Sequence, residues 1–213
     1  MNRSDAETLW DVARVLARDA AKVSRAPTSR DLPPLLFFTD PARTPRPWET
    51  AGRLPAGTAV VFRPFGQAEA RDTALRLREV TAAVGVQLLI GLDADLAEAV
   101  GADGLHLPER ALDQARTLSE AYPDWLITGA AHAGSALDAP HLHARVLSPV
   151  FAAGGASSAT PPLGLAAFQA LAAAAACPVY ALGGIDAKTA RDLIGSGACG
   201  LAGVSAIQAA FSA

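Results

Sequence analysis

The 213-residue sequence has little cysteine, no long apolar run and no excess of one charge. Its two cysteines, Cys177 and Cys199, do not form a CxxC motif, and such sparse usage is typical of a reducing cytoplasm. No segment approaches the roughly 20 consecutive apolar residues of a membrane span. Residues 1–18 place acidic side chains among the apolar ones, which excludes a secretory signal. We therefore predict a cytoplasmic protein.

The charge balance also bears on the choice of partner. Eighteen Lys and Arg residues face 21 Asp and Glu residues, for a net charge of −3. A mildly acidic chain has no electrostatic reason to bind nucleic acid or an anionic membrane, and we expect neither as a partner. With 51% apolar residues, the chain can bury about 70% of its unfolded surface in one domain.

Eight short apolar runs alternate with segments of helical period. Most of the runs lack polar alternation, which is typical of strands that are covered on both faces. The predicted strands are 35–40, 59–63, 86–90, 104–107, 125–129, 145–150, 178–183 and 200–204. The predicted helices between them are 69–84, 95–100, 111–121, 165–176 and 187–194.

This alternation is compatible with a closed barrel or with a doubly wound open sheet. Eight repeats in so short a chain favour an α/β fold of the (βα)8 TIM-barrel type. An extra amphipathic helix over about 5–23 precedes the first strand, and it either packs on the barrel, plugs its floor or serves a partner. We predict a helical extension over 1–30 and a single barrel domain over 31–213, and a homodimer is compatible with this arrangement.

Barrel enzymes build their active sites at the carboxyl ends of the strands. There, Gly183 and Gly184 follow the seventh predicted strand and precede a helix expected near Asp186. Ser205 and Ala206 occupy the matching position after the eighth strand. Glycine lets main-chain N–H groups approach an anion, and barrels commonly place a phosphate after these two strands. We predict a phosphate site at these four residues, although a tight strand-to-helix turn alone also needs glycine.

Other polar residues at strand ends have both a chemical and a structural interpretation. His132 ends the fifth strand, where it is either an acid/base group or an exposed loop residue. His106, between two leucines, is predicted to be a hydrogen-bonded core residue. Arg63 ends a buried strand and is predicted to contact an anion, unless it pairs with a carboxylate. Asp93 starts a helix, where capping is favoured over metal binding.

Several of these residues lie in blocks that resemble a known family. The blocks are G-A-D-G-L-H-L at 101–107, S-P-V-F at 148–151, L-G-G-I at 182–185 and V-S-A-I at 204–207. In this order and at barrel spacing they resemble the thiamine phosphate synthase/TenI family, over about residues 35–207. The resemblance implies a (βα)8 barrel that acts in thiamine biosynthesis. Its synthases couple a hydroxymethylpyrimidine diphosphate to a thiazole phosphate with Mg²⁺, and TenI-type relatives bind or tautomerise the thiazole phosphate.

The resemblance carries few site residues over to this chain. It assigns Gly183, Gly184, Ser205 and Ala206 to the thiazole phosphate, and His132 to proton transfer. Arg63 matches an arginine of the family's second strand, but Phe65 stands where the family has lysine. Of the loop that holds pyrophosphate in synthases, only Ser157, Ser158 and Thr160 remain, and Ser157 and Thr160 are predicted to be substrate contacts.

The two Mg²⁺ carboxylates of the synthases are missing by simple alignment. Asp93 and Glu109 stand one or two residues away and could replace them only after a local shift. Loss of the metal ligands and of the lysines would cost several kcal/mol of leaving-group stabilisation, roughly tenfold in rate for each 1.4 kcal/mol. We therefore expect a protein that binds a small phosphorylated heterocycle without a cofactor. If it is catalytic, it tautomerises that ligand, with His132 as the catalytic residue. The alternatives are a Mg²⁺-dependent synthase and a non-catalytic ligand-binding relative.

Overall fold

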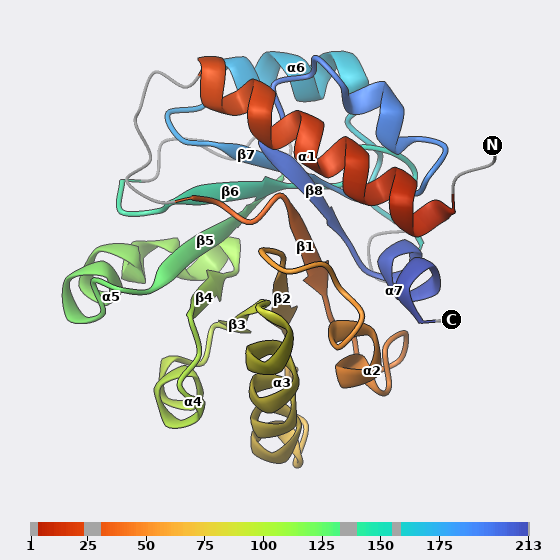
Figure 1. The fold of residues 1–213 in the computed structure, drawn as a ribbon. Coiled ribbons are helices and arrows are strands. Elements are labelled where there is room, and N and C mark those ends of the chain that lie inside the picture. The colour runs from red at the N-terminus through yellow and green to blue at the C-terminus, as the bar shows by residue number, and fades with distance from the viewer. Residues whose placement is uncertain (1–3, 24–30, 133–139, 155–158, 213) are drawn as a thin grey trace.

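The computed structural model describes residues 4–23, 31–132, 140–154 and 159–212. Eight parallel strands form a closed barrel in the order β1 to β8, with β8 paired back to β1 (Figure 1). The strands are β1 (Leu35–Phe38), β2 (Ala59–Phe62), β3 (Gln87–Gly91), β4 (Gly104–Leu107), β5 (Leu126–Ala131), β6 (Ala144–Leu147), β7 (Val179–Leu182) and β8 (Gly200–Gly203). The predicted TIM-barrel fold is therefore confirmed, and each predicted strand is present, with ends that differ by up to three residues.

Alternate residues along each strand face opposite sides of the barrel wall, because successive side chains of a strand point to opposite faces. One buried cluster fills the interior and includes Phe38, Val61, Leu89 and Tyr180. A second and larger cluster, with Phe37, Val60 and Leu88 among its members, joins the barrel to its helices. Burial on both sides explains why the strands read as continuous apolar runs.

The helices lie outside the barrel. They are α1 (Asp5–Val23), α2 (Pro47–Ala51), α3 (Ala70–Val84), α4 (Ala94–Val100), α5 (Ala115–Ala121), α6 (Leu165–Ala174) and α7 (Ser205–Phe211), with 3-10 turns η1 (Glu109–Gln114) and η3 (Ala190–Leu193). Gly85 and Gly101 end α3 and α4 with φ of +70° and +64°, the left-handed conformation that glycine adopts without strain.

The predicted helix over 187–194, and its start near Asp186, are wrong. Only the turn η3 forms there, and a polar turn precedes it. The Asp186 carboxylate accepts hydrogen bonds from the main-chain N–H groups of Lys188 and Thr189, at 2.8 and 3.0 Å. Such an Asx turn competes locally with helix formation. A helix dipole at this position therefore makes no contribution to the predicted phosphate site.

Helix α1 packs on the flank of the barrel beside the segment that lacks a helix. It contacts β8, α7 and η3, and Figure 1 shows it running across this side of the molecule. Its buried residues Leu9, Val12, Ala13 and Leu16 belong to the same cluster as the outer face of the barrel. Packing on the barrel is thus the role that these contacts support for the helix. The predicted domain boundary at residue 30 falls outside the described residues.

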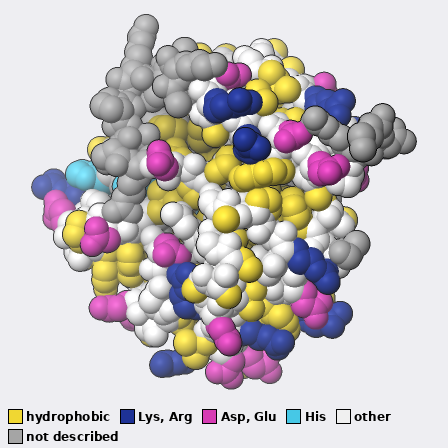
Figure 2. All heavy atoms as spheres, in the orientation of Figure 1, with side chains coloured by type: hydrophobic (Ala, Val, Ile, Leu, Met, Phe, Trp, Pro, Cys, Tyr) yellow, Lys and Arg dark blue, Asp and Glu magenta, His cyan; other side chains and the backbone are white. Residues whose placement is uncertain are grey.

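Charged side chains of both signs are interspersed over the face shown in Figure 2. This mixture agrees with the nearly balanced composition. In the described part of the chain, every helix is too short or too polar to cross a membrane.

Candidate functional site

The carboxyl ends of β7 and β8 lie side by side, since Leu182 pairs with Ala202 in the ladder. Gly183 and Gly184 follow β7 with φ of +99° and +65°. Helix α7 begins at Ser205, two residues after the end of β8. Within the described ranges, the main-chain N–H groups of Gly184, Ser205 and Ala206 donate to no acceptor. Three amide donors are therefore available at adjacent strand ends.

Close packing also requires glycine at these two positions. A Cβ atom on Gly184 would lie 2.5 Å from the carbonyl oxygen of Ala152, and one on Gly183 would lie 2.7 Å from Cα of Pro149. The neighbouring segment after β6 therefore presses against the pair, and their positive φ adds a conformational reason for glycine. Both glycines are half-buried and Ser205 is exposed, so the amides lie at the surface of the rim.

Arg63 directly follows β2 and is held by three neighbours. Its backbone N–H donates to Oγ1 of Thr39 at 3.0 Å, and its Nε donates to the carbonyl oxygen of Thr39 at 2.8 Å. The guanidinium lies 5.4 Å from the ring centre of Phe38 and 5.1 Å from that of Phe65. Its Nη2 is buried and has no hydrogen-bond partner among the described residues. Burial lowers the pKa of Arg63 to about 10, with Asp40 acting in the opposite direction and Arg43 in the same direction.

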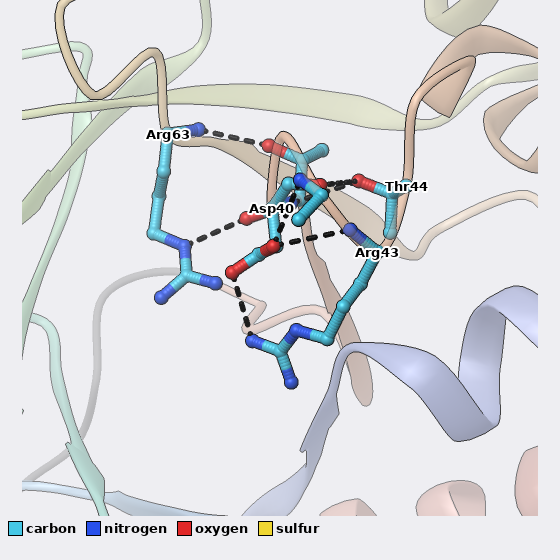
Figure 3. Close-up of polar contacts among 6 residues, drawn as sticks. Asp40, Arg43, Thr44 and Arg63 are labelled. Carbon is cyan, nitrogen blue, oxygen red and sulfur yellow. Dashed lines mark hydrogen bonds and ion pairs between the residues drawn. The ribbon is translucent and has the colours of Figure 1, made fainter. Parts of the chain in front are cut away.

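Beside Arg63, the loop after β1 holds a compact polar turn (Figure 3). Oδ1 of Asp40 accepts hydrogen bonds from the main-chain N–H groups of Ala42 and Arg43, both at 3.1 Å. Oδ2 accepts one from Nη2 of Arg43 at 3.0 Å, and the hydrogen bond to this side chain is the largest cause that lowers the pKa of Asp40. The sequence analysis did not identify Arg43. The only feature that could have indicated its contact with Asp40 is the spacing of three residues between this strand-end aspartate and the arginine.

His106 points into the barrel below this turn. It is buried, its Nδ1 lies 3.0 Å from Oγ1 of Thr128, and its ring meets Phe38 edge to face at 4.9 Å between centres. Burial, followed by the charge of Arg63, lowers the pKa of His106 to about 3, so its ring is neutral near pH 7. The prediction of a hydrogen-bonded core histidine is confirmed.

His132 and Glu109 meet at the rim between β4 and β5. Nδ1 of His132 lies 2.7 Å from Oε2 of Glu109. Both side chains remain open to solvent, with 49% and 42% of their surface exposed. His132 continues the alternation in which Leu126 and Thr128 face the barrel interior.

The two metal candidates have structural roles. Asp93 caps α4, since its Oδ1 accepts a hydrogen bond from the N–H of Leu96 at 2.9 Å, and the predicted capping role is confirmed. Glu109 pairs with His132. No group of three or more His, Cys, Asp or Glu residues suited to a metal occurs in the described residues. Each candidate carboxylate thus has a contact within the chain, Asp93 in a helix cap and Glu109 with His132.

Two further residues, Ser157 and Thr160, are predicted to be substrate contacts. Ser157 lies outside the described residues, so this prediction stays untested. Thr160 is exposed, and its side chain makes no hydrogen bond to any residue that the structure describes. The described rim thus comprises three separate groups, which are the amides after β7 and β8, the arginines after β1 and β2, and the His132–Glu109 pair.

Comparisons with known proteins agree with this architecture. A family model described as thiamine monophosphate synthase, TMP-TENI, matches residues 49–207. The thiamine-phosphate synthase of Methanoculleus marisnigri is 37% identical over 141 residues, which are 64% of this chain and 66% of that protein. The thiamine-phosphate synthase of Chloroflexus aurantiacus is 34% identical over 141 residues, 65% of each chain. The matched region thus spans slightly less than two thirds of these curated relatives.

A solved structure shows the same fold. Thiamine phosphate pyrophosphorylase from Pyrococcus furiosus superposes with a TM-score of 0.68 over 84% of this chain and 91% of its own. The two sequences are 20% identical, so this similarity supports the barrel fold only. The chemistry has to be argued from the site residues.

Proposed function

Because the chain belongs to the thiamine monophosphate synthase family, we propose that it binds a thiazole phosphate or a similar heterocyclic monophosphate at the carboxyl-end rim of its barrel. The observation that carries this proposal is the set of amide donors of Gly184, Ser205 and Ala206 at adjacent strand ends. Main-chain N–H groups in such a turn suit a phosphate, and barrels often place one after these two strands. Helix α7 has only seven residues, so local hydrogen bonds rather than a helix dipole provide the attraction.

The proposed chemistry is a proton transfer on the bound ring, as in TenI-type tautomerases. His132 is the acid/base group, and it takes a proton from one ring position and returns it to another. Glu109 accepts the hydrogen bond of Nδ1–H, which orients the ring and selects its tautomer. This chemistry needs no divalent ion.

Synthase activity is the second candidate, because the curated relatives carry that name. Its diphosphate leaving group is ordinarily stabilised by a metal and by cationic side chains. Asp93 forms a helix cap and Glu109 a hydrogen bond with His132, so a Mg²⁺ site at these carboxylates would compete with both contacts. Arg63 would then contact the diphosphate.

Calorimetry separates these functions. We expect thiazole phosphate to bind without Mg²⁺, and the pyrimidine diphosphate to gain no affinity when Mg²⁺ is added. Metal-dependent binding of the diphosphate together with product formation would establish the synthase instead.

Turnover separates the tautomerase from a non-catalytic binder. We expect His132→Ala to bind thiazole phosphate normally and to lose at least about a hundredfold in tautomerisation rate, the usual contribution of an acid/base group. His141→Ala is the matched control, since His141 is an exposed histidine after β5. Unchanged turnover in His132→Ala would remove the acid/base role, and no turnover in the wild type would leave a binding protein.

A further inference from the structure

The segment after β7 folds back on its own glycine pair through one threonine. Oγ1 of Thr189, a half-buried residue, donates a hydrogen bond to the carbonyl oxygen of Gly184 at 3.0 Å. The same oxygen atom accepts a hydrogen bond from the main-chain N–H of Asp186, also at 3.0 Å. The hydroxyl group therefore links the turn at Asp186 to a residue of the proposed phosphate site.

The peptide group before Gly184 is held from the opposite side. The carbonyl oxygen of Gly183 accepts a hydrogen bond from the N–H of Phe151 at 3.0 Å, and Phe151 belongs to the segment after β6. In a planar trans peptide the C=O and N–H groups point in opposite directions. The N–H of Gly184 therefore points away from the β6 side. Strand β8 lies on the other side of β7, so this N–H points toward the strand that Ser205 and Ala206 follow.

Hydrogen bonds to both neighbouring carbonyl groups restrict a residue that is otherwise the most flexible in the chain. Glycine has no Cβ atom, and it can rotate about both of its backbone dihedrals at little steric cost. The Phe151 N–H fixes the peptide before Gly184, and the Thr189 hydroxyl fixes the peptide after it. A donor that is already oriented binds an anion more tightly, because less conformational entropy is lost on binding.

We propose that Thr189 is a positioning residue of the phosphate site, which acts by holding the main chain of Gly184 through its hydroxyl group. The inference rests on the proposed function and deepens it, because it assigns a side chain to a site that is otherwise built from main-chain donors. Thr189 itself does not touch the phosphate in this arrangement. Its contribution passes through the Gly184 peptide alone.

A simpler role for Thr189 is to close the turn at Asp186. The hydroxyl has a single proton, and the Gly184 oxygen at 3.0 Å is nearer to it than Oδ1 of Asp186 at 3.3 Å. Oδ1 also accepts hydrogen bonds from the N–H groups of Lys188 and Thr189. Asp186→Ala therefore removes the carboxylate of the turn and leaves both main-chain partners of the Thr189 hydroxyl in place. This variant separates the turn from the hydrogen bond to Gly184.

Two substitutions and one distant control test the hydroxyl directly. Thr189→Val removes the hydroxyl, and Thr189→Ser retains it. Thr58→Val is the matched control, because the buried Thr58 hydroxyl donates to the carbonyl oxygen of Pro55 at 2.8 Å just before β2, at the opposite end of the barrel. Thr189→Ala should behave as Thr189→Val does, and it takes the place of that variant if the valine prevents folding. Thermal unfolding identifies the variants that are folded at the temperature of the binding experiment.

The experiment is a titration of the isotope-labelled full chain with inorganic phosphate, followed by NMR at the amide signals of Gly184 and Ser205. We expect the phosphate Kd to rise about fivefold in Thr189→Val, as for loss of one neutral hydrogen bond. The Kd should stay within about twofold of the wild type in Thr189→Ser, Asp186→Ala and Thr58→Val. The carbonyl carbon signal of Gly184 should shift in Thr189→Val before phosphate is added, and it should return in Thr189→Ser.

The outcomes distinguish this inference from the proposed function. If the wild-type amides of Gly184 and Ser205 do not respond to phosphate, the proposed function fails. If they respond and Thr189→Val binds phosphate as the wild type does, only the role of Thr189 is overturned. An equal rise in Kd in Asp186→Ala or Thr58→Val would also overturn it, since the effect would then come from the turn or from general loosening. So would a loss of affinity that Thr189→Ser does not restore.

Discussion

Over β1 to β5 the rim of the barrel carries its polar groups on side chains, whereas over β7 and β8 it carries them on the main chain. In the first region, Arg63 and His132 are held by Thr39 and Glu109 through specific atoms. In the second, Gly183 and Gly184 contribute no side chain, and backbone shape decides where the donors lie.

The β1–β5 and β7–β8 regions of the rim should therefore respond to different perturbations. Side-chain charges depend on pH, salt and the identity of a partner carboxylate. Main-chain donors do not titrate, and they are lost only when the backbone moves. A steric substitution should therefore affect the β7–β8 region most, and a charge substitution the β1–β5 region.

The largest effect is expected for Gly184→Ala. Its Cβ would lie 2.5 Å from the oxygen of Ala152, at a φ of +65°. We expect thiazole phosphate affinity to fall at least about tenfold, and the free energy of unfolding to fall by more than in Gly195→Ala. Gly195 has a φ of +80° but no described atom near its Cβ position, so its substitution costs only the left-handed conformation, about 1–2 kcal/mol. Equal stability losses with unchanged affinity would refute the steric argument.

The pH dependence of folding stability should come partly from His106, which lies in the β1–β5 region. The pKa of His106 is about 3 in the folded protein, below the value near 6.5 of an unfolded chain. The folded state then binds fewer protons, so His106 reduces stability as pH falls from about 6.5 towards 3, by up to roughly 1.4 kcal/mol per pH unit. Urea unfolding between pH 7 and 4 should show this slope in the wild type and in His132→Gln, and a smaller slope in His106→Gln. An equal slope in all three would contradict it.

Arg63→Gln should separate binding from stability. It removes a cation whose Nη2 is buried without a described partner, so we expect little loss of folding free energy, or a gain. Affinity for inorganic phosphate at the predicted anion contact of Arg63 should fall about tenfold or more, with no change at the Gly184 and Ser205 amides. Chemical denaturation and a phosphate titration followed by NMR check both. A fall at both sites would show that the two regions are coupled.

The smallest effect is expected for Asp93→Ala, which removes the cap of α4. Stability should fall by about 1 kcal/mol, and Asp95→Ala, also in the first turn but without a capping bond, should cost less. Mg²⁺ affinity, measured by calorimetry, should be the same in both variants and in the wild type. Loss of Mg²⁺ binding in Asp93→Ala alone would assign this residue to a metal site.

Sequence patterns were informative where one physical cause acts over a whole segment. Burial on both faces made the strands recognisable, and the helix over 5–23 has the predicted bounds because its apolar stripe is continuous. The cap at Asp93 and the core position of His106 followed from their immediate neighbours in the chain. Each of these depends on local pattern and burial.

Contacts between loops were not predictable in the same way. The Glu109–His132 pair joins residues 23 positions apart, and neither spacing nor composition specifies it. Arg43 acquires its place from a turn that Asp40 and Thr44 close, and its relation to Arg63 exists only after β1 and β2 pair. The prediction of a helix after Gly184 was wrong because the Asp186 carboxylate accepts hydrogen bonds from nearby main-chain N–H groups and stabilises a turn instead.

A crystal structure with thiazole phosphate bound would examine the β7–β8 amides directly. We expect the phosphate oxygens within about 3 Å of the N–H groups of Gly184, Ser205 and Ala206, a normal hydrogen-bond distance. A phosphate found elsewhere on the rim, with these amides bonded to water or to the protein, would contradict the main-chain site.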